Sequence, residues 1–221
     1  MEELAIKALW HEYDKKLEQS LQLNYRIIKE MQTQKYEDQI GSFKRNQVAA
    51  VVAGVIWIMI LVFLVVNTLH NLYFVASVGM IALFNVFAVA AYIRHLVLLD
   101  QVDISDSITD SQQKLAVIQV SLNNVGRILV LQAPFYCTFW YNQELVDHAG
   151  FTFWAINLSI VTVFVAGSIY LFNTLTHENI HRKWVRGFIE GYGGKKLIKA
   201  MEFLKQIEEY KSEVGGRKSE V

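Results

Sequence analysis

The sequence predicts an all-α integral membrane protein, a transmembrane four-helix bundle with helical cytoplasmic extensions and both termini in the cytoplasm. Three observations predict it. Apolar stretches of about 20 residues, the length of helix that crosses a bilayer, recur along the 221-residue chain. Nearly all charged residues lie outside these stretches. The charged segments repeat apolar residues at helical spacing and contain no proline.

The composition excludes several other classes of protein. Apolar residues make up 53% of the chain and charged residues 19%, which excludes a disordered chain. A single cysteine, Cys137, excludes a disulfide scaffold. The 21 basic residues are balanced by 21 acidic residues, and without a basic excess we expect no nucleic-acid partner.

Residues 1–47 predict a cytoplasmic amphipathic helix that resembles one strand of a coiled coil. Apolar residues at spacings of four and seven form a stripe on a polar helix. An asparagine within the stripe could fix the register in which the helix pairs with a partner helix. The stripe residues, which are the candidate partner-binding residues, are Trp10, Leu17, Leu21, Asn24, Ile28 and Met31. Two interpretations are open. The stripe docks on this chain's own cytoplasmic helices, or it pairs with another chain, either a cytoplasmic protein or a second copy.

Residues 48–93 predict the first transmembrane hairpin, with spans at 48–66 and 72–93. The first span contains no charged or polar side chain, and the second is interrupted by two firmly polar residues, Ser77 and Asn85. Each span is about 30 Å long as a helix, which matches the hydrocarbon core of a bilayer. In the first span, the small residues at positions 50 and 54 favour close contact with a neighbouring helix.

Residues 94–121 predict a cytoplasmic helical connection. Asp103, Asp106 and Asp110 share one helical face, which suggests the hypothesis of a divalent-cation site. Their spacing lacks the ligand pattern and the glycine of an EF-hand loop. Asp and Ser residues ahead of an apolar run that begins at Leu115 are more typical of helix N-caps and first-turn anions. We expect this helix to continue into the next span.

Residues 122–172 predict the second transmembrane hairpin, with spans at 122–141 and 151–172. The later span is free of charge, whereas the earlier one includes Arg127 and Pro134. We expect Arg127 to extend its charged group to the inner membrane interface. We expect Pro134 to kink a helix that its neighbours shield from lipid.

The distribution of basic residues favours four spans over three. Residues 1–47 hold 8 Lys and Arg residues, residues 94–127 hold 3 and residues 173–221 hold 10, so the short turns 67–71 and 142–150 hold none. Four spans place every basic residue in the cytoplasm, as the positive-inside rule requires, whereas three would place the basic tail outside. We therefore predict an inner-membrane protein with cytoplasmic N and C termini, for which the lipid bilayer is the first partner.

Polar side chains inside the spans predict packing more than transport. Asn85, Gln132 and Asn157 are expected to form hydrogen bonds between helices. Ion and proton pathways usually need an ionisable residue within the membrane, and the three firm spans hold none. A transport subunit is therefore the weaker alternative.

Residues 173–221 predict a cytoplasmic amphipathic helical tail interrupted by the glycine-rich turn at 191–194. An apolar stripe follows the turn and consists of Leu197, Met201, Leu204 and Ile207. We expect the tail to fold back onto residues 1–47, so that the two stripes cover each other. A second interpretation is a helix that lies on an anionic membrane face, because lysines follow the turn.

The tail also contains one motif with catalytic potential. His177, Glu178 and His181 form the pattern H-E-x-x-H, in which two histidines on one helical face hold zinc and the glutamate activates water. Arg182 and Lys183 follow at once, where such helices usually continue with uncharged residues. A membrane zinc metalloprotease is therefore the minority hypothesis, and zinc is expected as a cofactor only under it.

Four runs resemble an uncharacterised four-span integral membrane family of Bacteroidota. They are WHEYDKKLEQSLQLN at 10–24, VDIS at 102–105, QKL at 113–115 and APFY at 133–136. The resemblance covers most of the chain, and its motifs carry no assigned chemistry. Some members of such families are encoded beside alternative sigma factors, which implies a regulatory role.

The leading functional hypothesis is a membrane-tethered regulator or scaffold without catalytic activity. It acts through a helical cytoplasmic domain formed by residues 1–47, 94–121 and 173–213, and restraint of a sigma factor is its most specific form. We expect a cytoplasmic protein or a second copy of the chain to bind the stripe in residues 1–47.

Overall fold

The computed structural model describes residues 2–102, 107–176, 179 and 181–218. This described part of the chain is all-helical, with 90% of its residues in helices and no strand. The α-helices are α1 (Glu2–Asn67), α2 (Leu72–Asp100), α3 (Ile108–Val130), α4 (Gln143–His148), α5 (Phe151–Thr174), α6 (Lys183–Ile189) and α7 (Lys195–Lys218). A 3-10 helix, η1 (Ala133–Cys137), follows α3, and a π-helical turn, η3 (Glu190–Gly194), joins α6 to α7.

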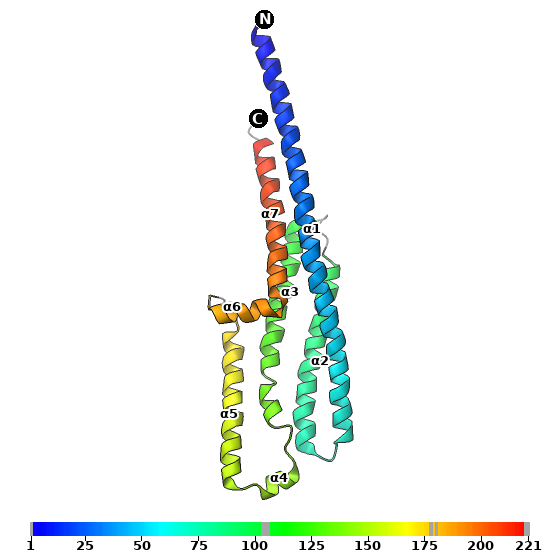
Figure 1. The fold of residues 1–221 in the computed structure, drawn as a ribbon, viewed down its shortest axis with the longest axis vertical. Helices are drawn as coiled ribbons and strands as arrows, with labels where there is room; N and C mark the ends of the chain where they lie inside the picture. The colour runs from blue at the N-terminus through cyan, green and yellow to red at the C-terminus, as the bar shows by residue number, and fades with distance from the viewer. Residues whose placement is uncertain (1, 103–106, 177–178, 180, 219–221) are drawn as a thin grey trace.

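The molecule is elongated, and its two chain ends lie at the same end (Figure 1). We call this end, formed by the charged segments, the polar end, and the opposite one, which carries α4, the apolar end. Among the described residues, four helical segments are long and apolar enough to cross a membrane, and they lie in α1, α2, α3 with η1, and α5. The prediction of an all-α chain with four apolar helices is therefore confirmed.

The first predicted hairpin is formed by the C-terminal part of α1 and by α2. The Oδ1 atom of Asn71 caps α2 by accepting a hydrogen bond from the backbone N–H of Phe74 at 3.2 Å. The Nδ2 atom of Asn71 also donates to the carbonyl oxygen of Tyr141 at 2.8 Å, which joins the two turns at the apolar end. Gly54 contacts α2 so closely that an added Cβ would lie 2.6 Å from the Cγ2 atom of Val89. The predicted close contact at this glycine is confirmed.

The third predicted span differs from its expectation. Residues 122–141 were expected to form one kinked helix, but α3 ends at Val130 and the chain continues as a turn and then η1. Pro134 explains the break, because proline lacks an N–H group and its ring clashes with the carbonyl four residues earlier, which belongs to Val130. Pro134 instead occupies the first turn of η1, where a missing N–H does no harm.

Polar side chains fasten the broken segment to its neighbours. The Nδ2 atom of Asn85 on α2 donates to the Oε1 atom of Gln132 at 3.2 Å. The Tyr141 hydroxyl donates to the Oδ1 atom of Asn157 on α5. All three residues predicted to form hydrogen bonds between helices do form tertiary hydrogen bonds, but each bond joins a helix to the turn or loop of the broken segment. The Ser77 and Thr138 hydroxyls add a third link, with 2.9 Å between their oxygens.

The polar end holds the largest core of the molecule. It is built by residues 32–47 of α1, the end of α2, the first half of α3, and α7. We call it the polar-end core, and its buried residues are Tyr36, Phe43, Leu99, Leu115, Ile118, Leu122, Leu197, Ala200, Leu204 and Ile207. The tail therefore folds back onto α1, as its stripe predicted.

Between α5 and α7 the chain changes direction twice. The helix α6 lies across the long axis of the molecule, and α7 then runs beside α1 (Figure 1). Val185 and Ile189 of α6 are buried against Leu175, while basic residues and Trp184 of the same segment stay exposed. The turn η3 needs glycine at Gly194, where a Cβ would lie 2.6 Å from the carbonyl oxygen of Ile189. The predicted interruption at residues 191–194 is thus confirmed.

Candidate functional site

The first part of α1 extends past the polar-end core and beyond the end of α7 (Figure 1). We call residues 6–31 of this helix the N-terminal arm. Side-chain pairs one turn apart reinforce it: Lys16 with Glu12 at 2.8 Å and Arg26 with Glu30 at 3.2 Å. The arm is therefore a charged helix that still carries apolar residues.

The six predicted partner-binding residues all lie on this arm, and none of them is buried. Trp10, Leu17 and Met31 are 67%, 59% and 52% exposed. Asn24 is exposed, and Leu21 and Ile28 are half-buried. Because all six share one helix, the arm presents a nearly continuous apolar stripe that the described part of the chain does not bury.

The two interpretations of the stripe apply to different parts of α1. Residues 32–47 dock on this chain's own helices, because Tyr36, Ile40 and Phe43 pack into the polar-end core. These three residues were not among the predicted contact residues, and at 100° per residue they lie roughly 100° around the helix from the stripe. The buried part of α1 and the exposed arm therefore use different faces of the same helix.

Polar contacts hold α7 against its neighbours around the apolar core. The Nζ atom of Lys196 donates to the Oγ atom of Ser42 on α1 at 2.8 Å. Thr109 and Gln112 of α3 donate to the two carboxylate oxygens of Glu208 at 3.3 and 3.4 Å. The α7 stripe and the polar residues beside it therefore hold the tail against this chain's own helices. Among the described charged segments, the arm keeps a row of exposed apolar residues.

The α1–α2 pair is also joined at the polar end. The Nζ atom of Lys44 lies 2.9 Å from the Oδ1 atom of Asp100. The hydrogen bond and the charge of Lys44 lower the pKa of the Asp100 carboxyl below its usual value. Asp100 is therefore charged at neutral pH, and it continues the ionic surface around the polar-end core.

A histidine is buried where α2 leaves its apolar stretch. His95 is 0% exposed, and its Nε2 atom lies 2.8 Å from the Oγ atom of Ser121 on α3. Its Nδ1 atom has no hydrogen-bond partner. Burial, and then the charge of Arg94, lower the pKa of His95 from 6.5 to about 4. The imidazole is therefore neutral in the folded protein at physiological pH.

This lowered pKa predicts acid sensitivity of the fold. Below about pH 6.5 the unfolded chain binds a proton at His95 that the folded chain does not bind until about pH 4. Stability should therefore fall between these values, by about 2 kcal/mol after allowance for solvent screening. Thermal unfolding in detergent from pH 7 to pH 4.5 measures the slope. His95→Gln is expected to flatten it, whereas His11→Gln on the exposed arm should leave it unchanged. Equal slopes for His95→Gln and the wild type would contradict the assignment.

The acidic residues of the α2–α3 connection give a mixed outcome. The Oγ atom of Ser107 accepts a hydrogen bond from the backbone N–H of Asp110 at 3.3 Å, and Asp110 lies in the first turn of α3. The interpretation as an N-cap and a first-turn anion is confirmed for these two residues. Asp103 and Asp106 lie outside the described residues.

Of the three residues that define the H-E-x-x-H motif, the structure describes only the last. His181 is exposed in the turn before α6, while His177 and Glu178 lie outside the described residues. No group of three or more His, Cys, Asp or Glu side chains suited to a metal ion is found where the structure is described. The zinc hypothesis stays a prediction, because two of its three residues fall outside that search.

The arm is the surface that the geometry singles out, since its residues share chemistry, face and exposure. Comparisons with known protein families, with curated proteins and with solved structures find no match for this chain. A helix of this kind can bind another amphipathic helix or an apolar groove through residues at positions i, i+4 and i+7.

Proposed function

We propose that this chain is a multi-pass protein of the inner membrane that acts, without catalysis, as a membrane-tethered regulator or scaffold. The observation that supports this most is the contrast along α1. Residues 32–47 are buried by α7, whereas the stripe of the N-terminal arm stays exposed. A row of exposed apolar residues on a charged helix is typical of a surface that binds another protein.

We further propose that the polar end faces the cytoplasm. Both chain ends lie at that end (Figure 1), and the turns at the apolar end carry no lysine or arginine. The cytoplasmic segments would then hold all 21 basic residues and 19 of the 21 acidic ones, because only Glu144 and Asp147 lie in the outer turns. This asymmetry supports the orientation under the positive-inside rule.

The partner that fits the arm is a cytoplasmic protein with an amphipathic helix or an apolar groove. Trp10 and Leu17 supply large side chains for such a groove, and flanking pairs such as Lys16 with Glu12 form a polar rim. An alternative sigma factor is the specific partner that the resemblance to the Bacteroidota family implies. In this form the proposal is that the arm holds the sigma factor at the membrane and away from its target.

Replacing Leu17 with aspartate tests the arm as a binding surface. The full-length protein in detergent, carrying a photo-crosslinker on the arm, is mixed with a candidate sigma factor from the same organism. We expect Leu17→Asp to weaken binding by at least about tenfold, because an unpaired carboxylate is then buried in an apolar interface. Leu21→Asp should behave similarly. Both residues are exposed or half-buried, so the fold should be unaffected.

Leu23 offers a matched control for this experiment. It is 59% exposed, as Leu17 is, but lies roughly 80–160° around the helix from the stripe residues. Leu23→Asp should therefore bind normally. If the arm crosslinks only to a second copy of this chain, and Leu17→Asp abolishes that crosslink, the stripe binds a second copy and not a cytoplasmic protein. Equal loss in Leu17→Asp and Leu23→Asp would contradict a stripe-specific surface.

A further inference from the structure

A cavity of about 550 Å³ lies on one face of α3, between α2 and α5. Ten residues line it: Phe87, Ala90, Ala91, Arg94, Ser121, Asn124, Val125, Arg127, Ile128 and Phe172. This volume falls within the roughly 300–1,000 Å³ of small-molecule sites. Two of the lining residues are arginines and none is acidic. The cavity therefore carries positive charge without a carboxylate in its wall to neutralise it.

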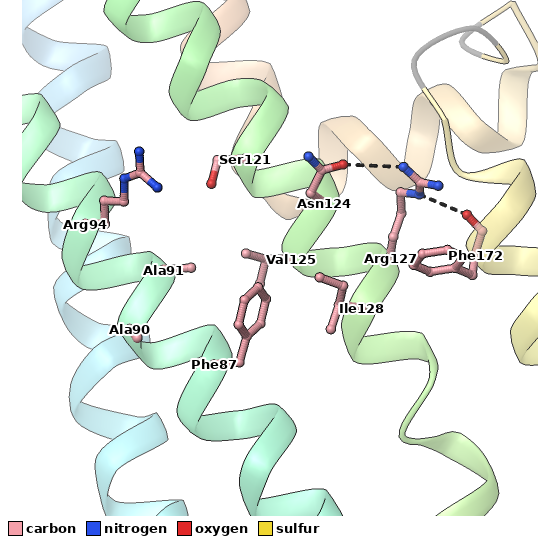
Figure 2. Close-up of a pocket in the computed structure, with 10 residues that line it drawn as sticks. All are labelled: Phe87, Ala90, Ala91, Arg94, Ser121, Asn124, Val125, Arg127, Ile128 and Phe172. Carbon is pink, nitrogen blue, oxygen red and sulfur yellow. Dashed lines mark hydrogen bonds between the residues drawn. The ribbon is translucent and has the colours of Figure 1, made fainter.

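Arg127 of α3 is held in a fixed position at one side of this cavity (Figure 2). Its Nε atom donates to the carbonyl oxygen of Phe172 at 2.9 Å, and its guanidinium lies 4.7 Å from the centre of the Phe172 ring. An Nη atom also donates to the Oδ1 atom of Asn124 at 3.4 Å. All these partners are neutral, so the charge of Arg127 is oriented but not balanced.

Arg94 of α2 lies at the opposite side of the cavity (Figure 2). It is exposed, and its side chain makes no hydrogen bond or ion pair with another described residue. Ser121 lies between the two arginines in this view, and its hydroxyl is hydrogen-bonded to His95. The cavity is therefore lined by an arginine from each of two helices and by polar side chains of α3.

The lining changes from polar to apolar along the molecular axis. Phe87 lies seven residues before Arg94 on α2, which is about 10 Å closer to the apolar end. On α3 the order is the same, since Ser121 and Asn124 precede Ile128. The arginines thus lie where the apolar stretches end, and the wall below them is aromatic and aliphatic.

A second hollow of about 330 Å³ continues this apolar lining deeper along α5. It is lined by Leu131 and Pro134 on one side and by Val161, Val165 and Ser168 among others on α5. Positions 161, 165, 168 and 172 recur at spacings of four, three and four, so they share one helix face with Phe172 of the upper cavity. The break between α3 and η1 at Pro134 opens this lower hollow.

We propose that the cavity between α2, α3 and α5 binds an anionic phospholipid, with its headgroup at the arginine-lined part of the cavity and an acyl chain along the face of α5. Charge complementarity carries the choice of occupant, because two arginines without a carboxylate attract an anion. The apolar wall below them requires that this anion carry a hydrocarbon chain. The exposed basic residues of α6 add positive charge near the same level.

Lipid binding to the purified, delipidated full-length protein tests this site. Native mass spectrometry with dioleoyl phosphatidylglycerol and dioleoyl phosphatidylcholine gives the affinity for each. We expect the anionic lipid to bind wild type more tightly, and Arg94→Gln to weaken it about fivefold to tenfold without changing the zwitterionic lipid. Arg127→Gln should weaken it similarly. Because Arg127 also joins α3 to α5, Arg94→Gln is the decisive variant if Arg127→Gln fails to fold.

Arg45→Gln is the matched control. Arg45 is exposed on α1 near the same end of the molecule and does not line the cavity, so its loss removes one charge elsewhere. Equal weakening by Arg45→Gln and Arg94→Gln would overturn the site in favour of general surface charge. Equal binding of the two lipids would overturn it as well. Complete displacement of phosphatidylglycerol by millimolar inorganic phosphate would overturn the need for an acyl chain.

Discussion

Replacing Leu204 with aspartate is expected to release α7 from the rest of the polar end. Leu204 is 0% exposed and packs with Phe43 of α1 and Leu115 of α3 in the polar-end core. Removal of a buried leucine side chain typically lowers the free energy of unfolding by about 2–5 kcal/mol, and a buried unpaired carboxylate adds several more. The loss therefore exceeds what the polar contacts at Lys196 and Glu208 can offset.

Limited proteolysis in detergent measures this release. We expect Leu204→Asp to be cleaved quickly within residues 195–212, while the apolar helices stay protected by the micelle. Lys199→Asp is the control, because Lys199 is exposed on the same helix and its replacement should leave cleavage slow. A Leu204→Asp protein as resistant as the wild type would contradict the packing of α7 against α1.

Replacing Gly54 with leucine is expected to push α1 and α2 apart at the centre of their hairpin. Even a single added Cβ at Gly54 would lie 2.6 Å from the Cγ2 atom of Val89. Val89 cannot turn away at small cost, because a β-branched residue in a helix has one strongly preferred rotamer. Overpacking of this kind destabilises by about 1–3 kcal/mol, and apolar helices in lipid depend on such close contact to associate.

Alanine substitutions at two glycines, Gly54 and Gly79, are expected to shift the thermal unfolding temperature in opposite directions, and this difference tests the second prediction. Gly54→Ala should lower the thermal unfolding temperature, and Val89→Ala should restore it in the double variant. Gly79→Ala on α2 should raise it slightly, because nothing lies within 4 Å of an added Cβ there and alanine is the better helix former by about 1 kcal/mol. Equal shifts for Gly54→Ala and Gly79→Ala would contradict the close contact.

The apolar helices were predictable because their signal is local. Residues 48–66, 72–93 and 151–172 hold no charge, and the helices that contain them begin or end within a residue or two of the predicted limits on the loop side. The distribution of basic residues identified the segment at 122–141 as a span, but it did not predict where the helix in that segment ends. Pro134 predicts a disturbed helix, and whether the chain bends or stops depends on what satisfies the freed backbone groups. Here a turn and η1 satisfy them.

The candidate site was predictable in its face but not in its extent. Periodicity identifies which side of a helix is apolar, and it did so for residues 10–31 as well as for α7. It does not state where the partner helix starts and stops. The start of α7 is set by α6 and by the turn at Gly194. These elements direct α7 along α1, and α7 covers α1 only over the length of the polar-end core. The cavity between Arg94 and Arg127 had no sequence signal, since the two residues are far apart in the chain.

The continuity of α1 sets a fixed height for whatever binds its stripe. The helix runs from Glu2 to Asn67 without a break, and 30 residues separate Leu17 from the last residue before the apolar stretch. At 1.5 Å per residue this is a rigid spacer of about 45 Å. A partner that binds at Leu17 would thus be held at a set distance from the apolar half of α1. Because the helix is unbroken, a change in the tilt of its apolar half would also move the N-terminal arm.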